Sequence, residues 1–215
     1  MCYNNYINSY TKSRGIGAAG SAFDWQSKGQ GFEPPMLHQS KMGKAHFFHF
    51  KDEELKMMQH PFPPLYDKNS KILILGSFPS VKSREQMFFY GHPQNRFWKV
   101  TATVFGCEVP NNIEEKKHFL ISNGIALWDV IASCNIIGSS DSSIKNVVPN
   151  DLSPILNNSQ ISAIFTNGKT SEKYYKKYME QITGIKSVCL PSTSPANAAW
   201  SLEQLIEAWD IIKIK

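Results

Sequence analysis

The sequence lacks the short motifs that identify several enzyme classes directly. It has no GxGxxG and no GxxxxGK[ST] pattern, so the usual phosphate cradles of dinucleotide-binding and P-loop proteins are absent. No serine stands in a GxSxG context, which excludes the nucleophile elbow of the α/β-hydrolases. The cysteines form no CxxC pair and match no zinc or cluster spacing. We therefore expect neither a metal nor another cofactor. The four cysteines are Cys2, Cys107, Cys134 and Cys189.

Long apolar runs are also missing. No stretch reaches the roughly 18 apolar residues of a membrane-spanning helix, and the N-terminus lacks the basic and then apolar order of a signal peptide. We expect a cytoplasmic protein with no membrane association. The 215 residues, 41% of them hydrophobic, can form one domain with a core. The net charge of +5 permits a polyanionic partner without requiring one.

Residues 1–57 differ from the rest of the chain. They contain glycines and polar residues without a sustained period, which predicts a disordered leader before an ordered domain over 58–215. The tetrapeptide GFEP (31–34) is encoded by GGA-TTC-GAA-CCN, which resembles the complementary strand of a transfer-RNA T-arm. One hypothesis is a mis-assigned start, with the natural one at Met57, Met58 or Met42. The alternative is a genuine disordered tail.

The ordered part alternates apolar runs with helical patterns. Short β-branched and leucine-rich runs predict buried strands at 71–77, 125–131, 161–168 and 186–192. Periodicity and capping residues predict helices at 95–106, 112–124, 148–158, 169–182 and 201–213. This order predicts an α/β fold, a three-layer α/β/α sandwich with a small, mainly four-stranded parallel sheet.

Ligands of such sheets bind beyond the carboxyl ends of the strands. The four predicted ends read GSFPS, LWDV, TNGK and LPSTSPANA, which is unusually polar and aromatic for plain turns. After the first strand, FFYGHPQN could stack a base and hold phosphates. Two plainer alternatives stay open. Phe88 and Phe89 could be core residues, and Asn95 could be only a helix cap.

Taken together and in this order, GSFPS, YGHPQNRFW, LWDV and PSTSPAN resemble the uracil-DNA glycosylase superfamily, most closely its hypoxanthine-DNA (deoxyinosine) glycosylase branch. The resemblance runs from His60 to the C-terminus. It implies that the first motif lies beneath a deaminated base and positions water. It also implies that the last motif presses on the minor groove while the nucleotide is flipped out, and that the asparagine of GHPxN, here Asn95, is catalytic.

The sequence differs from the wider superfamily at several motif positions, and these differences limit the branches that it can belong to. The acidic residue that activates water in sister families is here Ser77. The histidine that supports the uracil anion is replaced by Leu190, which weakens the expectation of efficient uracil excision. The iron–sulfur branch needs four placed cysteines that this chain does not offer.

The resemblance assigns residues to a base pocket and to a DNA-binding surface. The expected base pocket comprises Gly76, Ser77, Phe78, Pro79, Ser80, Tyr90, Trp128 and Asp129. The expected DNA contacts are Arg84, His92, Lys169, Ser192, Thr193, Ser194, Pro195, Ala196 and Asn197.

These assignments predict a repair enzyme that flips a deaminated nucleotide out of DNA and hydrolyses its N-glycosidic bond. Lys169 is the only lysine in the four strand-end motifs, so we expect hydrolysis without a Schiff base, leaving an abasic site. We expect a monomer acting on DNA that contains deaminated bases. The alternatives are a uracil or mismatch glycosylase and a non-catalytic nucleic-acid-binding module.

Overall fold

A computed structural model describes residues 56–213 of the chain. Its centre is a parallel sheet in the order β3-β2-β6-β7, and every neighbouring pair in it is parallel. The strands are β2 (Ile72–Gly76), β3 (Ile125–Asp129), β6 (Ala163–Asn167) and β7 (Ser187–Leu190). All residues of β2 and β3 are buried, as expected for apolar strands covered on both faces.

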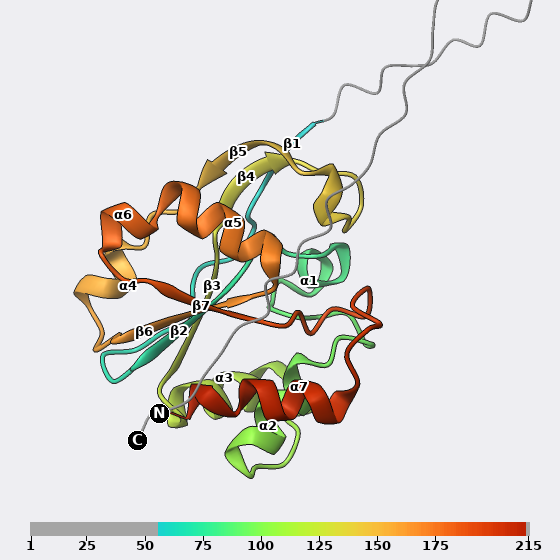
Figure 1. The fold of residues 1–215 in the computed structure, drawn as a ribbon, viewed down its shortest axis with the longest axis vertical. Coiled ribbons are helices and arrows are strands. Elements are labelled where there is room, and N and C mark those ends of the chain that lie inside the picture. The colour runs from blue at the N-terminus through green and yellow to red at the C-terminus, as the bar shows by residue number, and fades with distance from the viewer. Residues whose placement is uncertain (1–55, 214–215) are drawn as a thin grey trace, which may run out of the picture. The chain divides into compact units, whose positions relative to one another are not determined.

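Helices cover both faces of this sheet (Figure 1). In that view α5 and α6 lie above the sheet, and α2, α3 and α7 lie below it. The predicted three-layer sandwich with a four-stranded parallel sheet is therefore confirmed. The helices are α1 (Val81–Gln86), α2 (Phe97–Phe105), α3 (Ile113–Ser122), α4 (Ser153–Asn157), α5 (Lys169–Tyr178), α6 (Glu180–Thr183) and α7 (Leu202–Trp209), with short 3-10 turns η1 (Asp141–Ser143) and η2 (Asp210–Ile212).

A second, antiparallel sheet was not predicted. It has the order β1-β4-β5 and is built from β1 (Met57–Gln59), β4 (Ile131–Asn135) and β5 (Lys145–Pro149). The strand predicted over 125–131 is wrong beyond Asp129, where the chain leaves the parallel sheet and begins β4. Only Asp129 interrupts the apolar run at this point, and no glycine or proline marks the change.

Two predicted helices also have different bounds. The helix expected at 148–158 is shorter, because β5 extends to Pro149 and α4 begins only at Ser153. The helix expected at 169–182 is divided into α5 and α6 at Met179. The predicted caps hold, since Asn112 caps α3 and Ser201 forms a capping box with Gln204 at α7.

The leader predicted at 1–57 lies almost wholly outside the described residues. Its last residue, Met57, belongs to β1 and pairs with Asn135 of β4.

Among the helices that the structure describes, none is both long enough and apolar enough to cross a membrane. Burial raises the pKa of the Cys134 thiol in β4 to about 11, so this cysteine is held as an unreactive thiol.

The strand order decides where a ligand can bind. From β2 the chain proceeds to β3 on one side of the sheet and later to β6 on the other. The loops after β2 and β6 therefore diverge and leave a crevice between the ends of these two strands. Gly76 ends β2 and Asn167 ends β6, so these residues should lie at the base of that crevice.

Candidate active site

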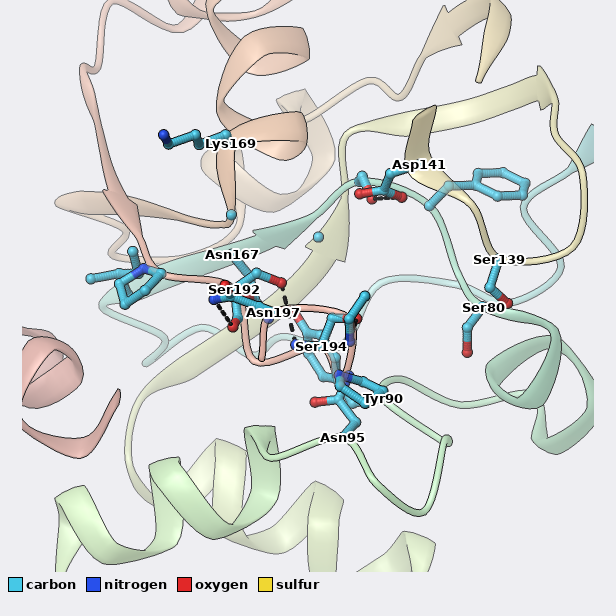
Figure 2. Close-up of a pocket in the computed structure, with 18 of the residues that line it drawn as sticks. Ser80, Tyr90, Asn95, Ser139, Asp141, Asn167, Lys169, Ser192, Ser194 and Asn197 are labelled. Carbon is cyan, nitrogen blue, oxygen red and sulfur yellow. Dashed lines mark hydrogen bonds between the residues drawn. The ribbon is translucent and has the colours of Figure 1, made fainter. Parts of the chain in front are cut away.

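A cleft of about 1270 Å³ opens at this switch point, between the carboxyl ends of the parallel strands (Figure 2). Most of the predicted site residues line it. From the expected base pocket it contains Gly76, Ser77, Phe78, Pro79, Ser80, Tyr90 and Asp129. The remaining predicted residues in its walls are His92, Asn95, Lys169, Ser192, Ser194, Pro195, Ala196 and Asn197.

The floor of the cleft depends on a glycine at the end of β2. Gly76 pairs with Asp129 of β3, whose side chain leans over it. A Cβ atom at Gly76 would lie 2.1 Å from Asp129 Oδ1 and 3.6 Å from the Tyr90 hydroxyl oxygen. Only glycine therefore leaves room for the carboxylate in this position.

Asp129 forms a buried pair with His60, a residue that the sequence analysis did not assign to the site. His60 Nε2 lies 2.8 Å from Asp129 Oδ2, and the two side chains are 4% and 8% exposed. Aromatic rings surround the imidazole, with centroids at 4.6 Å for Phe62 and 4.4 Å for Trp128. The pair spans 69 positions of sequence, so no local motif could reveal it.

A second carboxylate reaches the cleft from the loop before β5. Ser77 Oγ donates a hydrogen bond of 3.0 Å to Asp141 Oδ1. Burial raises the pKa of the Asp141 carboxyl, hydrogen bonds from Ser77 and Thr170 oppose this shift, and the nearby charge of Asp129 adds to it. The sequence shows Ser77 where sister families carry an acid. The fold supplies a carboxylate beside it from another segment.

Asn95 lies just before the N-cap of α2, which is Arg96, and it also lines the cleft. Its Oδ1 accepts a hydrogen bond of 2.9 Å from the backbone N–H of Phe97, at the start of α2. Among residues 56–213, no acceptor pairs with its Nδ2. The alternative that Asn95 is only the helix cap is therefore wrong. Its bond to the Phe97 N–H fixes the side-chain carbonyl and leaves the amide N–H groups for the cleft that Asn95 lines.

Tyr90 forms the wall beside Asn95. Its ring stacks on Phe97 with a centroid distance of 3.9 Å and an interplanar angle of 16°. Its backbone has φ of 49°, a left-handed conformation that is uncommon for a bulky residue. Burial and the charge of Asp129 raise the pKa of Tyr90, so the phenol keeps its proton and can donate a hydrogen bond.

The loop at 191–197 is held in shape by its own polar groups and by β6. Asn167 Nδ2 donates to Thr193 Oγ1 at 2.9 Å, and the Thr193 backbone N–H donates to Asn167 Oδ1 at 3.0 Å. Asn197 Nδ2 donates to the Ser192 carbonyl at 2.8 Å. The tip of the loop, Pro195 and Ala196, is exposed. The loop is thus a rigid projection at the rim of the cleft.

Arg96 ties this loop to the segment that carries Asn95. Its guanidinium donates to the carbonyls of Ser194 at 3.1 Å and Asn197 at 2.9 Å, and also to the carbonyl of Trp200. Its backbone N–H donates to the Thr193 carbonyl at 3.1 Å. Arg96 was not among the predicted site residues, because its partners lie about 100 residues away in the sequence and are backbone carbonyls, which no residue type reveals.

Several predicted positions are corrected by the structure. Trp128 packs in the core against His60 and does not line the cleft. Thr193 is fully buried, and its hydroxyl is bonded to Asn167 rather than available to a phosphate. Arg84 does not line the cleft, and its guanidinium donates hydrogen bonds to the carbonyls of Pro79 and Gly138.

The aromatic pair before Tyr90 is also core. Phe88 and Phe89 are 6% and 4% exposed, which confirms the plainer alternative and excludes them as a platform for a base.

Lys169 is exposed at the start of α5, across the cleft from Asn95 in Figure 2. Among the residues that the structure describes, no three His, Cys, Asp or Glu side chains converge to hold a metal ion.

Comparisons with known proteins agree with this geometry. The family model of the uracil DNA glycosylase superfamily matches residues 63–213. The chain is 32% identical over 155 residues to a hypoxanthine DNA glycosylase of Methanosarcina barkeri, an alignment that covers 71% of this chain and 96% of that protein. It is 34% identical over 158 residues to a hypoxanthine DNA glycosylase of Methanosarcina acetivorans, covering 73% and 98%.

A solved structure shares the fold as well. The solution NMR structure of a candidate uracil DNA glycosylase from Methanosarcina acetivorans superposes with a TM-score of 0.64 at 31% sequence identity. The match covers 74% of this chain and 98% of the other. The family match extends over most of the chain and includes every strand of the parallel sheet. The chain belongs to the uracil DNA glycosylase superfamily.

Proposed function

We propose that this protein is a monofunctional DNA glycosylase that releases hypoxanthine from deoxyinosine in DNA and leaves an abasic site. The relatives named as hypoxanthine DNA glycosylases support this substrate. The observation that carries the proposal is the position of Asn95. Its amide is fixed by the bond to Phe97 and lines a cleft large enough for a flipped base. A pure binding module needs no such preorganised donor.

The chemistry of the bond defines what the cleft must supply. Cleavage passes through an oxocarbenium-like sugar while the electron pair of the C1′–N9 bond moves onto the base. A donor near the base stabilises this developing negative charge. Asn95 Nδ2 has this role in our proposal, since its Oδ1 already accepts from the Phe97 N–H and an amide is no strong base. Hypoxanthine forms a more stable anion than adenine, so moderate catalysis suffices.

Water must approach C1′ from the opposite face of the sugar. We assign this task to Ser77 and Asp141, whose side chains are joined by a 3.0 Å hydrogen bond at the cleft wall. In Figure 2 Asp141 and Asn95 lie on opposite sides of the cleft. The oxygen of the water forms the new bond to C1′, and its proton passes to the Asp141 carboxylate and then to solvent.

The loop at 191–197 suits a protein that flips a nucleotide out of the duplex. Ser192 and Ser194 stand at the rim with hydroxyls that can contact the flanking phosphates, and Pro195 and Ala196 form a small, stiff tip for the minor groove. Thr193 shapes the loop from inside. Because one chain provides every wall of the cleft, we propose that the enzyme works as a monomer, in the cytoplasm.

The Asn95 assignment is tested by single-turnover release of base from oligonucleotides that contain inosine, xanthine or uracil. The unaltered protein should release hypoxanthine. Asn95→Ala should lose on the order of 10²-fold or more in rate, about the effect of removing one preorganised donor. Folding should be nearly intact, because the loss of one hydrogen bond, here the bond to the Phe97 N–H, costs about 1 kcal/mol. A well-folded Asn95→Ala protein with the unaltered rate would exclude Asn95 from catalysis.

The same assay separates the alternatives. Preference for uracil over inosine would make the protein a uracil or mismatch glycosylase. DNA binding without release of any base would make it a binding module. Lys169 is the only lysine that lines the cleft within residues 56–213, and it is exposed. Treatment with borohydride during the reaction should therefore trap no covalent complex with DNA. A trapped complex would overturn the monofunctional assignment.

A further inference from the structure

Arg84 joins two loops that form one wall of the cleft, and the cleavage chemistry described above gives it no role. It stands in the last turn of α1. Its Nη1 donates to the Pro79 carbonyl at 2.9 Å, in the loop after β2. Its Nη2 donates to the Gly138 carbonyl at 3.2 Å, in the loop between β4 and β5. The guanidinium also lies 5.7 Å from the centroid of the Phe78 ring. Arg84 therefore fixes one loop against the other.

The loop between β4 and β5 carries Asp141, the carboxylate that we assign to the attacking water. Residues 138–142 of this loop are exposed, so apolar packing contributes little to their position. Polar contacts to the segment after β2 hold the loop instead. The Val81 backbone N–H donates to Ser139 Oγ at 2.9 Å, and Ser77 Oγ donates to Asp141 Oδ1 at 3.0 Å. The place of the carboxylate thus depends on a few hydrogen bonds between two loops.

A reacting group on an exposed loop needs such support, because the productive geometry has to be held to within about 0.5 Å. A shift of about 1 Å can cost on the order of 10²-fold in rate. We propose that Arg84 is a positioning residue that fixes the loop of Asp141 against the loop of Ser77, and so holds the carboxylate where it accepts the proton of the attacking water. The inference rests on the proposed function, because Arg84 acts through Asp141.

The geometry favours this role over a contact with a DNA phosphate. Both terminal nitrogens of Arg84 donate to carbonyl groups of the protein, and the side chain does not line the cleft. The role also depends on the shape of the guanidinium. Its planar fork reaches two carbonyls at once, whereas the ammonium of a lysine is a single compact charge. Arg84→Lys should therefore restore only part of what Arg84→Met loses, although both positively charged side chains could attract a phosphate.

The test is a double-mutant cycle between Arg84→Met and Asp141→Asn, measured by single-turnover release of hypoxanthine from duplex inosine DNA at saturating protein. Arg84→Met should lower the rate on the order of tenfold or more. In the Asp141→Asn background the same change should alter the rate by less than about twofold, because the carboxylate that Arg84 positions is absent. Lys82→Met removes a positive charge from an exposed position of α1 and should keep the unaltered rate. Circular dichroism checks the fold of each variant.

The pH profile of the rate gives a second readout. Burial is the main cause of the raised pKa of Asp141, and the charge of Asp129 adds to it. Tyr174 and Cys134 also interact with Asp141, but burial raises their pKa values, so both stay neutral at acidic pH. A loop released into solvent loses this burial, so the acidic limb of Arg84→Met should move to lower pH. Loss of a nearby positive charge alone would move the limb to higher pH, and a limb that stays or rises would overturn the inference.

Two results of the cycle would also overturn the inference. Losses that multiply in the double variant would make Arg84 a structural residue that acts independently of Asp141. An unaltered saturated rate, with a slope of log affinity against log salt that is flatter by about 1, would make Arg84 a phosphate contact. If Arg84→Met does not fold, Ser139→Ala removes the neighbouring attachment and takes its place in the cycle, with the same criterion. Failure of the proposed function is distinct, since the unaltered protein would then release no hypoxanthine or Asp141→Asn would keep the full rate.

Discussion

At the scale of single residues, the cleft is organised by side chains that bond across long stretches of sequence. His60 fixes Asp129, Ser77 holds Asp141, and each pair joins segments more than 60 positions apart. The two carboxylates have different environments. Asp129 is bonded to an imidazole inside the core, whereas Asp141 is held by hydroxyl groups at the wall. When two carboxyl groups of one site lie in different environments, they commonly have different roles in the reaction.

The raised pKa of Asp141 gives a prediction for the pH dependence of base release. If the ionised carboxylate accepts the proton of water, the single-turnover rate should fall as the pH drops through this pKa. An ordinary aspartate has a pKa of about 3.9. The fall should occur at a higher pH than this, because the pKa of Asp141 is raised. Asp141→Asn should lower the rate on the order of 10²-fold and remove the acidic limb of the profile. Asp151→Asn, a change of an exposed aspartate outside the cleft, should keep the rate and the acidic limb of the unaltered protein. An unchanged acidic limb in Asp141→Asn would assign that limb to another group.

Gly76 gives a second prediction at this scale. Its replacement by alanine would place a methyl group 2.1 Å from Asp129 Oδ1, so the carboxylate must move. We expect Gly76→Ala to cost about 1–3 kcal/mol in free energy of unfolding, as for other overpacked sites. It should also weaken binding of a single-stranded oligonucleotide that carries one non-cleavable 2′-fluoro deoxyinosine. Urea unfolding and anisotropy measure the two effects. Unchanged stability and binding would show that the floor accommodates a side chain.

At the scale of elements, the sequence predicts the parallel sheet well and the antiparallel sheet not at all. The runs at β2 and β3 are apolar and fully buried, and β6 is buried at its three central residues, so composition alone reveals these strands. β5 alternates between exposed and half-buried residues, and β1 is only three residues long, so neither has a strong apolar pattern. The loop motifs of the site could be found in the sequence because each is a short run of unusual residues. Arg96 and Asn167 were missed because their roles depend on partners brought close only by the fold.

Arg96 carries the prediction at the element scale. It is a positioning residue that links the loop at 191–197 to the start of α2 through the carbonyl groups of Ser194 and Asn197. Arg96→Met should loosen the loop and slow base release from duplex inosine DNA on the order of tenfold or more. Release from single strands should fall less, because less stacking has to be undone. Lys99→Met, at an exposed position of α2, serves as the control. Equal losses on both substrates would indicate a general effect on folding instead.

At the scale of the whole molecule, the moderate positive charge and the position of the cleft define how DNA is held. The net charge is +5, and Lys169 stands exposed at the rim of the cleft. Other lysines of α5 are engaged locally. Lys176 pairs with Glu172 at 2.6 Å, and the amine of Lys177 lies 4.7 Å from the centroid of the Tyr178 ring. Lys169 is therefore the lysine of this helix best placed to meet a phosphate.

The last prediction concerns the salt dependence of this contact. Each phosphate that a lysine neutralises releases counterions, and the slope of log affinity against log salt changes by about 1 when one such contact is lost. Lys169→Ala should weaken binding to duplex DNA by a similar factor in every sequence context and flatten this slope by about 1. Lys177→Ala removes the same charge from the outer part of α5 and should leave the slope unchanged. Anisotropy titrations over a series of salt concentrations measure both variants. Equal slopes for Lys169→Ala and the unaltered protein would place the DNA backbone away from the start of α5. The strand would then have to enter the cleft along the loop at 191–197 alone.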